Sequence, residues 1–185
     1  MRSLVREIAA ATRGRTGTVL VIGYGSTLHS DDSVGPRIAE AIAGRGYPGV
    51  WAQALPQLVP ELAEPLARSR AAIFVDAALN PPRPHRPQRV FGLLRLQPSY
   101  IHHGGSLHTS DPRALLALAQ ALYGHCPPAW LLTVPGENFA LGETLSAQAA
   151  LGMTQAVAFL DRLLGARCRE KSMPERRVSS TQSLE

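Results

Sequence analysis

The chain has 185 residues, of which 45% are hydrophobic, and a formal net charge of +5. This length and apolar content favour a single globular domain and exclude a chain that is disordered throughout. No apolar run is long enough to cross a bilayer, and the N-terminal segment lacks the continuous apolar stretch of a secretory signal, so we expect a cytoplasmic protein with no membrane partner. Two cysteines, Cys126 and Cys168, are too few and too far apart for a disulfide framework.

The positive charge is unevenly distributed along the chain. Residues 18–165 contain ten Arg against ten Asp and Glu, so the excess lies in the flanking segments. Nucleic-acid binding usually needs a basic surface on the folded domain, and a neutral domain argues against it. We interpret residues 1–17 as an N-terminal extension, 18–165 as the domain and 166–185 as a disordered basic tail.

Strands and helices alternate in chain order. Apolar runs predict strands at residues 18–22, 50–54, 71–75 and 130–134, and the alternating segment 89–96 predicts a half-exposed edge strand. Helical spacing predicts helices at residues 33–43, 60–68, 112–123 and 146–164. This order predicts an α/β fold in three layers, with a mostly parallel twisted sheet of about five strands and helices on both faces.

Capping residues mark where three of these helices begin. Asp32 or Ser33 is predicted to cap the first helix, Ser110 or Asp111 the third, and Ser146 the last.

The sequence also predicts parts of the core. Small and apolar residues recur at helical spacing in and just before the last helix, and these should form its buried face: Leu145, Ala149, Gly152, Ala156, Phe159 and Leu163. We expect both tryptophans, Trp51 and Trp130, to lie in the core.

The most informative stretch runs from Val19 to Gly35, with the sequence VLVIGYGSTLHSDDSVG. An apolar strand breaks at a Gly-Tyr-Gly sequence, two adjacent carboxylates follow, Asp31 and Asp32, and a helix begins at once. Open α/β sheets place their chemistry where a strand ends and feeds a helix. Two acids in such a loop are costly unless helix N-terminal amides, a basic side chain or a metal shares the site.

Two further candidate ligands follow later strands. Asp76 comes directly after the strand at 71–75, and three histidines, His102, His103 and His108, precede the third helix. The carboxyl ends of parallel strands lie on one edge of a sheet, so Asp32, Asp76 and one histidine can approach each other there. Such a mixed oxygen and nitrogen site suits a borderline divalent ion with open positions. Without a metal, the two carboxylates could share a proton as an acid–base pair.

Each candidate also has an ordinary structural interpretation. Asp32 can serve only as an N-cap, and Asp76 only as a turn residue. His29, His85 and His125 are expected at the surface, the last in a helix-exit loop beside Cys126. Residue spacing alone leaves these alternatives open.

Four sequence elements occur in a fixed order: GYGSTLHSDDSVG at 23–35, VDA at 75–77, SLH at 106–108 and GETLS at 142–146. In this order they resemble the hydrogenase maturation proteases, the endopeptidases that process the large subunit of nickel–iron hydrogenases. The resemblance covers nearly the whole domain. The family's first motif is G-x-G-N-x-L-x-x-D-[DE]-x-x-G, and here Ser26 stands in place of the usual Asn and Ser33 where Gly is common.

The resemblance implies a function and a set of site residues. It assigns Asp32, as the second acid of the first motif, together with Asp76 and His108, as metal contacts, and it selects His108 over its neighbours. It implies an endopeptidase that removes a C-terminal extension from the nickel-loaded large-subunit precursor and so activates the hydrogenase. Nickel in the precursor would be the recognition element, and Asp32 and Asp76 the catalytic carboxylates of a metal-assisted or aspartic-type cleavage. We expect a monomer that binds nickel mainly through the precursor.

Two other functions fit parts of the sequence. A metal-sensing or chaperone module could bind the same precursor without cutting it, because retained ligands do not prove cleavage. A dinucleotide-binding enzyme would share the strand–glycine–helix opening, but Leu28 occupies the place of the third glycine and no acid follows the second strand to hold a ribose.

Overall fold

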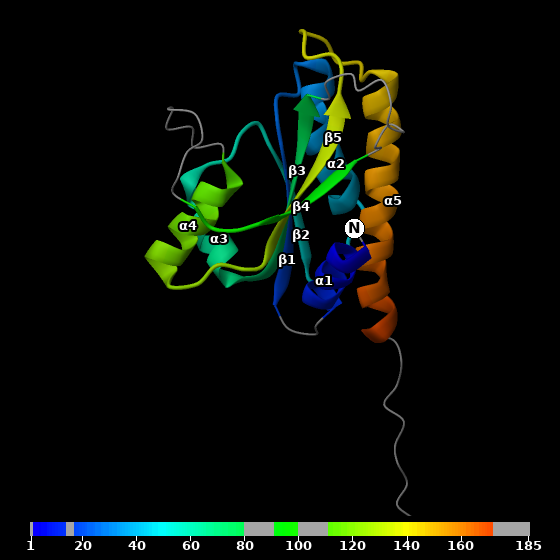
Figure 1. The fold of residues 1–185 in the computed structure, drawn as a ribbon. Helices are drawn as coiled ribbons and strands as arrows, with labels where there is room; N and C mark the ends of the chain where they lie inside the picture. The colour runs from blue at the N-terminus through cyan, green and yellow to red at the C-terminus, as the bar shows by residue number, and fades with distance from the viewer. Residues whose placement is uncertain (1, 14–16, 80–90, 100–110, 172–185) are drawn as a thin grey trace, which may run out of the picture.

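The computed structural model describes residues 2–13, 17–79, 91–99 and 111–171 of the chain. These residues form one five-stranded sheet with helices on both faces (Figure 1). Its strands are β1 (Thr18–Tyr24), β2 (Val50–Leu55), β3 (Ser69–Leu79), β4 (Gly92–Leu96) and β5 (Ala129–Gly136). The helices are α1 (Arg2–Arg13), α2 (Val34–Ala43), α3 (Ala63–Arg68), α4 (Pro112–Tyr123) and α5 (Ala147–Lys171).

The sheet has the strand order β2-β1-β3-β5-β4. The first four strands in this order pair in parallel, and β4 pairs antiparallel with β5 at one edge. The fold class predicted from the sequence, a mostly parallel sheet in a three-layer α/β arrangement, is confirmed, and so is the edge position of the alternating strand. The strands β1, β3 and β5 run in the same direction in the centre of the sheet, so their carboxyl ends share one edge.

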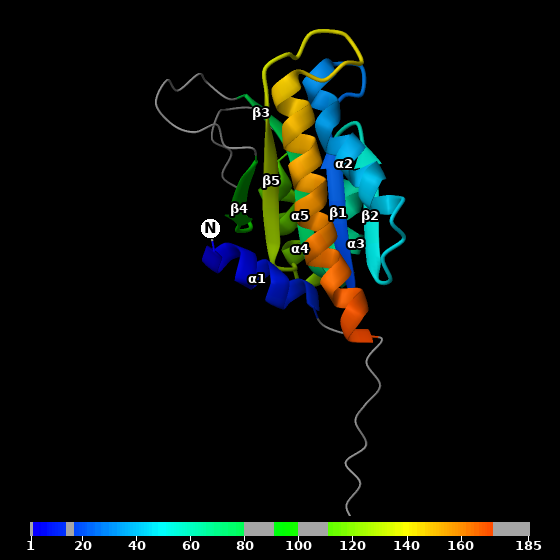
Figure 2. The same cartoon turned by 90° about the vertical axis from the view of Figure 1, so that its right-hand side faces the viewer.

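Two apolar clusters hold the three layers together. One joins α1, α2 and α5 to one face of the sheet, and the other joins α3 and α4 to the opposite face. Figure 2 shows α2 and α5 side by side over the first face, with α1 crossing its lower part. Alternate residues of each central strand point to each cluster, as expected for strands buried on both sides. Among the described residues, no helix is long and apolar enough to span a membrane.

Two of the three predicted helix N-caps are confirmed. Asp111 caps α4 by accepting a hydrogen bond from the Arg113 N–H at 2.8 Å. The Ser146 hydroxyl accepts from the Ala149 N–H at 3.1 Å at the start of α5. The predicted buried face of α5 is confirmed, because its members are buried or half-buried. At the third start the structure differs, since a short 3-10 turn (Ser30–Ser33) precedes α2 and Ser33 makes no side-chain cap.

The N-terminal segment contributes a helix that the sequence analysis did not predict. α1 packs Ile8 into the core fully buried, beside residues of the sheet and of α5. Arg95 on β4 also ties α1 to the sheet, because its guanidinium pairs with Glu7 at 2.8 Å and lies 4.8 Å from the ring centroid of Trp130. Residues 4, 5, 8, 9 and 11 carry the apolar spacing of a helix, so the signal was present in the sequence.

Two other expectations differ from the structure. Trp51 is 43% exposed, so its predicted core position is wrong, whereas Trp130 is fully buried as expected. The reason is position in the sheet: β2, which carries Trp51, is an edge strand, and β5, which carries Trp130, has a neighbour on each side. α5 also continues to Lys171, beyond the predicted helix end and into the segment interpreted as a disordered tail.

Candidate functional site

The loop after β1 is held against α2 by three glycines of the first motif. A Cβ on Gly23 would lie 2.0 Å from the carbonyl oxygen of Gly35, and a Cβ on Gly35 would lie 2.5 Å from that of Tyr24. Gly25 has a φ of +139°, and a Cβ there would lie 2.2 Å from the Asp32 carbonyl oxygen. The glycine spacing therefore lets the start of α2 pack directly on the ends of β1 and β3, which fixes where the loop with the two acids can run.

Asp31 is fully buried, and its carboxylate accepts hydrogen bonds from three backbone amides and from the Ser146 side chain. Its Oδ2 accepts from the N–H groups of Glu137 at 2.7 Å and Asn138 at 2.9 Å, and its Oδ1 accepts from the N–H of Ser146 at 2.6 Å. Burial by itself would raise the pKa of Asp31, but these hydrogen bonds outweigh it and lower the pKa below its usual value. Asp31 thus stays ionised. It joins the loop that follows β1 (residues 25–33, the β1 loop) to the loop that follows β5 (residues 137–146, the β5 loop) and to the start of α5.

Asp32 has a different environment from its neighbour. Its carboxylate is half-buried, and its Oδ2 accepts from the Ser26 N–H at 2.6 Å. It does not cap α2, so the alternative interpretation of Asp32 as an N-cap is wrong. The carboxylate instead folds back over the end of β1, because Gly25 leaves room for it.

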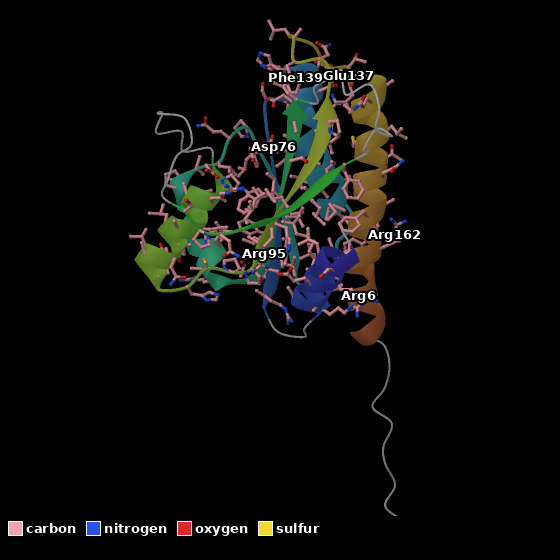
Figure 3. All side chains as sticks on the ribbon, viewed as in Figure 1. Arg6, Asp76, Arg95, Glu137, Phe139 and Arg162 are labelled. Carbon is pink, nitrogen blue, oxygen red and sulfur yellow. The ribbon has the colours of Figure 1, made fainter. Side chains whose placement is uncertain are left out.

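Asp76 lies on β3 beside the end of β1. The register pairs Gly23 with Val75, so the next residue of each strand, Tyr24 and Asp76, are neighbours at the carboxyl edge. The Tyr24 hydroxyl donates a hydrogen bond to the Asp76 carboxylate. Figure 3 shows Asp76 toward the same end of the sheet as Glu137 and Phe139, and away from Arg6.

Burial raises the pKa of Asp76 to about 6. The hydrogen bonds from Tyr24 and from the Ala77 N–H oppose this rise, and the negative charge of Asp32 adds to it. Burial, followed by the charge of Asp76, raises the pKa of Tyr24 above its usual value, so its hydroxyl remains a donor. Asp32 and Asp76 are therefore close enough to interact electrostatically at one edge of the sheet.

The start of α4 is near the same group of side chains. The charge of Asp111, the N-cap of α4, contributes to the raised pKa of Tyr24. In the sequence, His108 precedes Asp111 by three positions, and His102 and His103 come earlier in the same segment. All three histidines are outside the described residues. Within the described part of the chain, no group of three or more His, Cys, Asp or Glu side chains could hold a metal ion.

Of the other histidines, His125 lies at the surface in a helix-exit position as predicted, whereas His29, predicted at the surface, is half-buried. His125 is exposed after the end of α4, and Cys126 beside it is a free, half-buried thiol. His29 is half-buried in the β1 loop, where its Nδ1 is 2.8 Å from the Ser26 hydroxyl oxygen. His85 lies outside the described residues.

Sequence reasoning missed two residues of this region. Asp31 was one of a pair of acids, and nothing in the local pattern shows that its partners come from residues more than a hundred positions away. Tyr24 was noted only as the residue between two glycines. Its signal was available, because Tyr24 is a polar residue at the end of a central parallel strand, where the side chains of neighbouring strands come together.

No protein-family model matches the sequence. No curated protein matches it either. Solved structures do match the fold. The hydrogenase maturating endopeptidase HybD from E. coli is 23% identical, with a TM-score of 0.60 over 84% of this chain and 94% of its own.

Two archaeal structures show the same likeness. The [NiFe] hydrogenase maturation protease HybD from Thermococcus kodakarensis is 18% identical, with a TM-score of 0.58 over 80% of this chain and 99% of its own. The hydrogenase 2 maturation peptidase from Thaumarchaeota archaeon SCGC_AB-539-E09 is 22% identical, with a TM-score of 0.55 over 80% of this chain and 98% of its own. The chain therefore has the fold of the hydrogenase maturation proteases, the fold that its sequence motifs predicted.

Proposed function

We propose that this protein is an endopeptidase that removes a C-terminal extension from the nickel-loaded large-subunit precursor of a nickel–iron hydrogenase. It would act in the cytoplasm as a monomer. The observation that carries the proposal is the electrostatic pair of Asp32 and Asp76 at the carboxyl edge of a sheet that has the maturation-protease fold. Fold likeness alone would not identify an activity, so the proposal depends on these two side chains as well.

The two carboxylates suit a metal that arrives with another protein. Two partly exposed oxygen ligands attract a divalent cation, which would relieve the repulsion between them. They leave most coordination positions open, so the precursor would supply the other ligands. His108 is the proposed nitrogen ligand, because the sequence motif selects it and it lies three positions before the cap of α4.

Peptide cleavage needs an activated water and a polarised carbonyl. In the proposed reaction, the water oxygen bonds to the scissile carbonyl carbon, the carbon–nitrogen bond breaks, and a proton passes to the leaving amine. Nickel next to the scissile bond would polarise the carbonyl or lower the pKa of the water. In an aspartic-type cleavage, Asp76 would accept the water proton as general base, a role suited to a carboxyl group whose pKa is about 6. Both routes use Asp32 and Asp76.

The test is the intact mass of a nickel-loaded precursor incubated with this protein or with its Asp32→Ala variant. We expect loss of a C-terminal fragment with the native protein and no loss with the variant. A nickel-free precursor serves as the control and should remain intact. Binding of the loaded precursor without any mass loss would contradict the proposal and favour the non-catalytic metal-sensing module.

A further inference from the structure

The adjacent acids Asp31 and Asp32 have separate tasks. We propose that Asp31 is a positioning residue, which fixes the β1 loop to the β5 loop and the start of α5 and so holds the Asp32 carboxylate in place. This inference rests on the proposed function of Asp32 and adds a residue to which neither the motif nor the fold likeness gives a role.

The hydrogen-bond partners of the Asp31 side chain lie after β5 and at the start of α5. Its two oxygens accept three backbone N–H groups, from Glu137, Asn138 and Ser146, at 2.6 to 2.9 Å. The carboxylate is fully buried and no hydrogen bond connects it to Asp32 or Asp76. An acid whose acceptor capacity is directed to backbone amides cannot serve as a metal ligand without breaking them, so its contribution must pass through the loop.

Backbone hydrogen bonds around Asp31 join the same two loops. The Ser30 N–H donates to the Gly142 carbonyl at 2.7 Å, the Gly142 N–H donates to the Leu28 carbonyl at 2.9 Å, and the Asp31 N–H donates to the Asn138 carbonyl at 2.9 Å. These bonds continue the connection made by the Asp31 side chain along the same two loops. Ser30 has a φ of +30°, a conformation that a non-glycine residue adopts only when its surroundings impose it.

The loop that Asp31 anchors also carries Asp32. The Asp32 N–H donates to the His29 carbonyl at 2.8 Å, and the Asp32 side chain accepts from the Ser26 N–H at 2.6 Å. Both contacts of Asp32 are therefore within its own loop. The position of Asp32 relative to Asp76 then depends on how that loop is anchored to the rest of the fold, and Asp31 is a buried charged anchor within the loop.

The experiment compares Asp31→Asn with a matched control, Asp161→Asn. Asn offers one acceptor oxygen, and its amide group faces at least one N–H donor, so the anchor loosens while the side-chain volume stays the same. Asp161 on α5 accepts from the Tyr47 hydroxyl at 2.9 Å and pairs with Arg45 at 3.3 Å, so its variant also loses carboxylate contacts. We expect Asp31→Asn to lower kcat for precursor cleavage about 10²-fold, with little change in KM, because a small misplacement of a reacting group has this effect. Asp161→Asn should retain the native kcat, and equal kcat values for both variants and the native protein would overturn the proposal.

A second variant covers the case in which Asp31→Asn does not fold. The exposed Asn138 side chain donates to the Ser30 hydroxyl oxygen at 3.3 Å, so Asn138→Ala loosens the same pair of loops without altering a buried charge. It should lower kcat in the same direction but less, and an unchanged kcat would count against the positioning role.

Hydrogen exchange separates this inference from the proposed function. The Ser26 amide reports the position of the Asp32 carboxylate, because it donates to that group. Exchange of this amide should be faster in Asp31→Asn than in Asp161→Asn, even if the native protein leaves the precursor uncut. Absence of cleavage by the native protein would refute the proposed function, and equal exchange in the two variants would refute the positioning role.

Discussion

The hydroxyl of Tyr24 donates a hydrogen bond to the carboxylate of Asp76, and the two residues lie side by side where β1 ends beside β3. The bond joins two of the central strands at the edge that carries the candidate site. Burial raises the pKa of Asp76 and this bond lowers it, so Tyr24 keeps a half-buried carboxyl group ionisable near neutral pH.

Replacing Tyr24 with Phe should move the pH dependence of the reaction. The ring still packs in the cluster with α3 and α4, but Asp76 loses a donor and its pKa rises above about 6. Because a metal-binding or general-base carboxylate must be ionised, the acidic limb of the rate profile for precursor cleavage should shift to higher pH. Tyr123→Phe, on the half-exposed ring at the end of α4, is the control. An acidic limb at the same pH in all three proteins would disprove the role of the hydroxyl.

Replacing Asp76 with Asn should stabilise the protein at neutral pH while abolishing cleavage. The folded-state pKa of Asp76 is about 6 and its ordinary value is 3.8, so the folded protein holds a proton that the unfolded chain has released. The free energy of unfolding of the native protein therefore falls as pH rises from about 4 to 6, and it stays lower at higher pH. The Asp76→Asn variant has no carboxyl group to ionise at this position, so it does not lose this free energy.

The measurement is urea unfolding of both proteins in the presence of a chelator. The difference in free energy of unfolding should be near zero below pH 4 and about 1–2 kcal/mol in favour of Asp76→Asn above pH 7, after allowance for solvent screening. A variant that is less stable than the native protein at neutral pH would show that Asp76 holds the fold together.

The histidines before α4 can be ranked by substitution. His108→Ala should slow precursor cleavage at least about 10-fold, the loss expected for weakened metal binding, and His102→Ala should have little effect. The ranking follows from the sequence motif around residues 106–108. Cleavage rates of the two variants at equal precursor concentration test this ranking. An equal loss of rate in both variants would show that His108 is not the preferred metal contact.

The glycine packing at the end of β1 can be tested by stability alone. Gly23→Ala introduces a Cβ 2.0 Å from the Gly35 carbonyl oxygen, which is backbone and cannot move aside cheaply, so we expect a loss of about 3 kcal/mol. Gly44→Ala is the matched control, because Gly44 has an ordinary helical conformation and its Cβ would lie 3.6 Å from the nearest atom. Its free energy of unfolding should change by less than about 1 kcal/mol in either direction. Comparable losses in both variants would mean that α2 is not confined by Gly23.

The elements whose signals are local could be predicted from the amino-acid sequence. The span of α4 and its cap at Asp111, the buried face of α5, and the edge strand β4 were all predicted, because capping and hydrophobic periodicity depend on residues within a few positions of each other. The order of strands and helices predicted the sheet edge to which Asp32 and Asp76 belong, since strand direction in a parallel sheet follows from alternation along the chain.

The different environments of adjacent or similar residues arise from contacts between distant parts of the chain, which the sequence did not predict. Trp51 and Trp130 look alike in sequence, yet one lies on an edge strand and the other in the interior of the sheet. Asp31 and Asp32 are chemically identical neighbours, and their roles diverge because one meets three amides from the β5 loop and α5 while the other faces the edge of the sheet. These contacts join residues more than a hundred positions apart, so no local pattern encodes them, and burial and backbone geometry assign each carboxylate its partner.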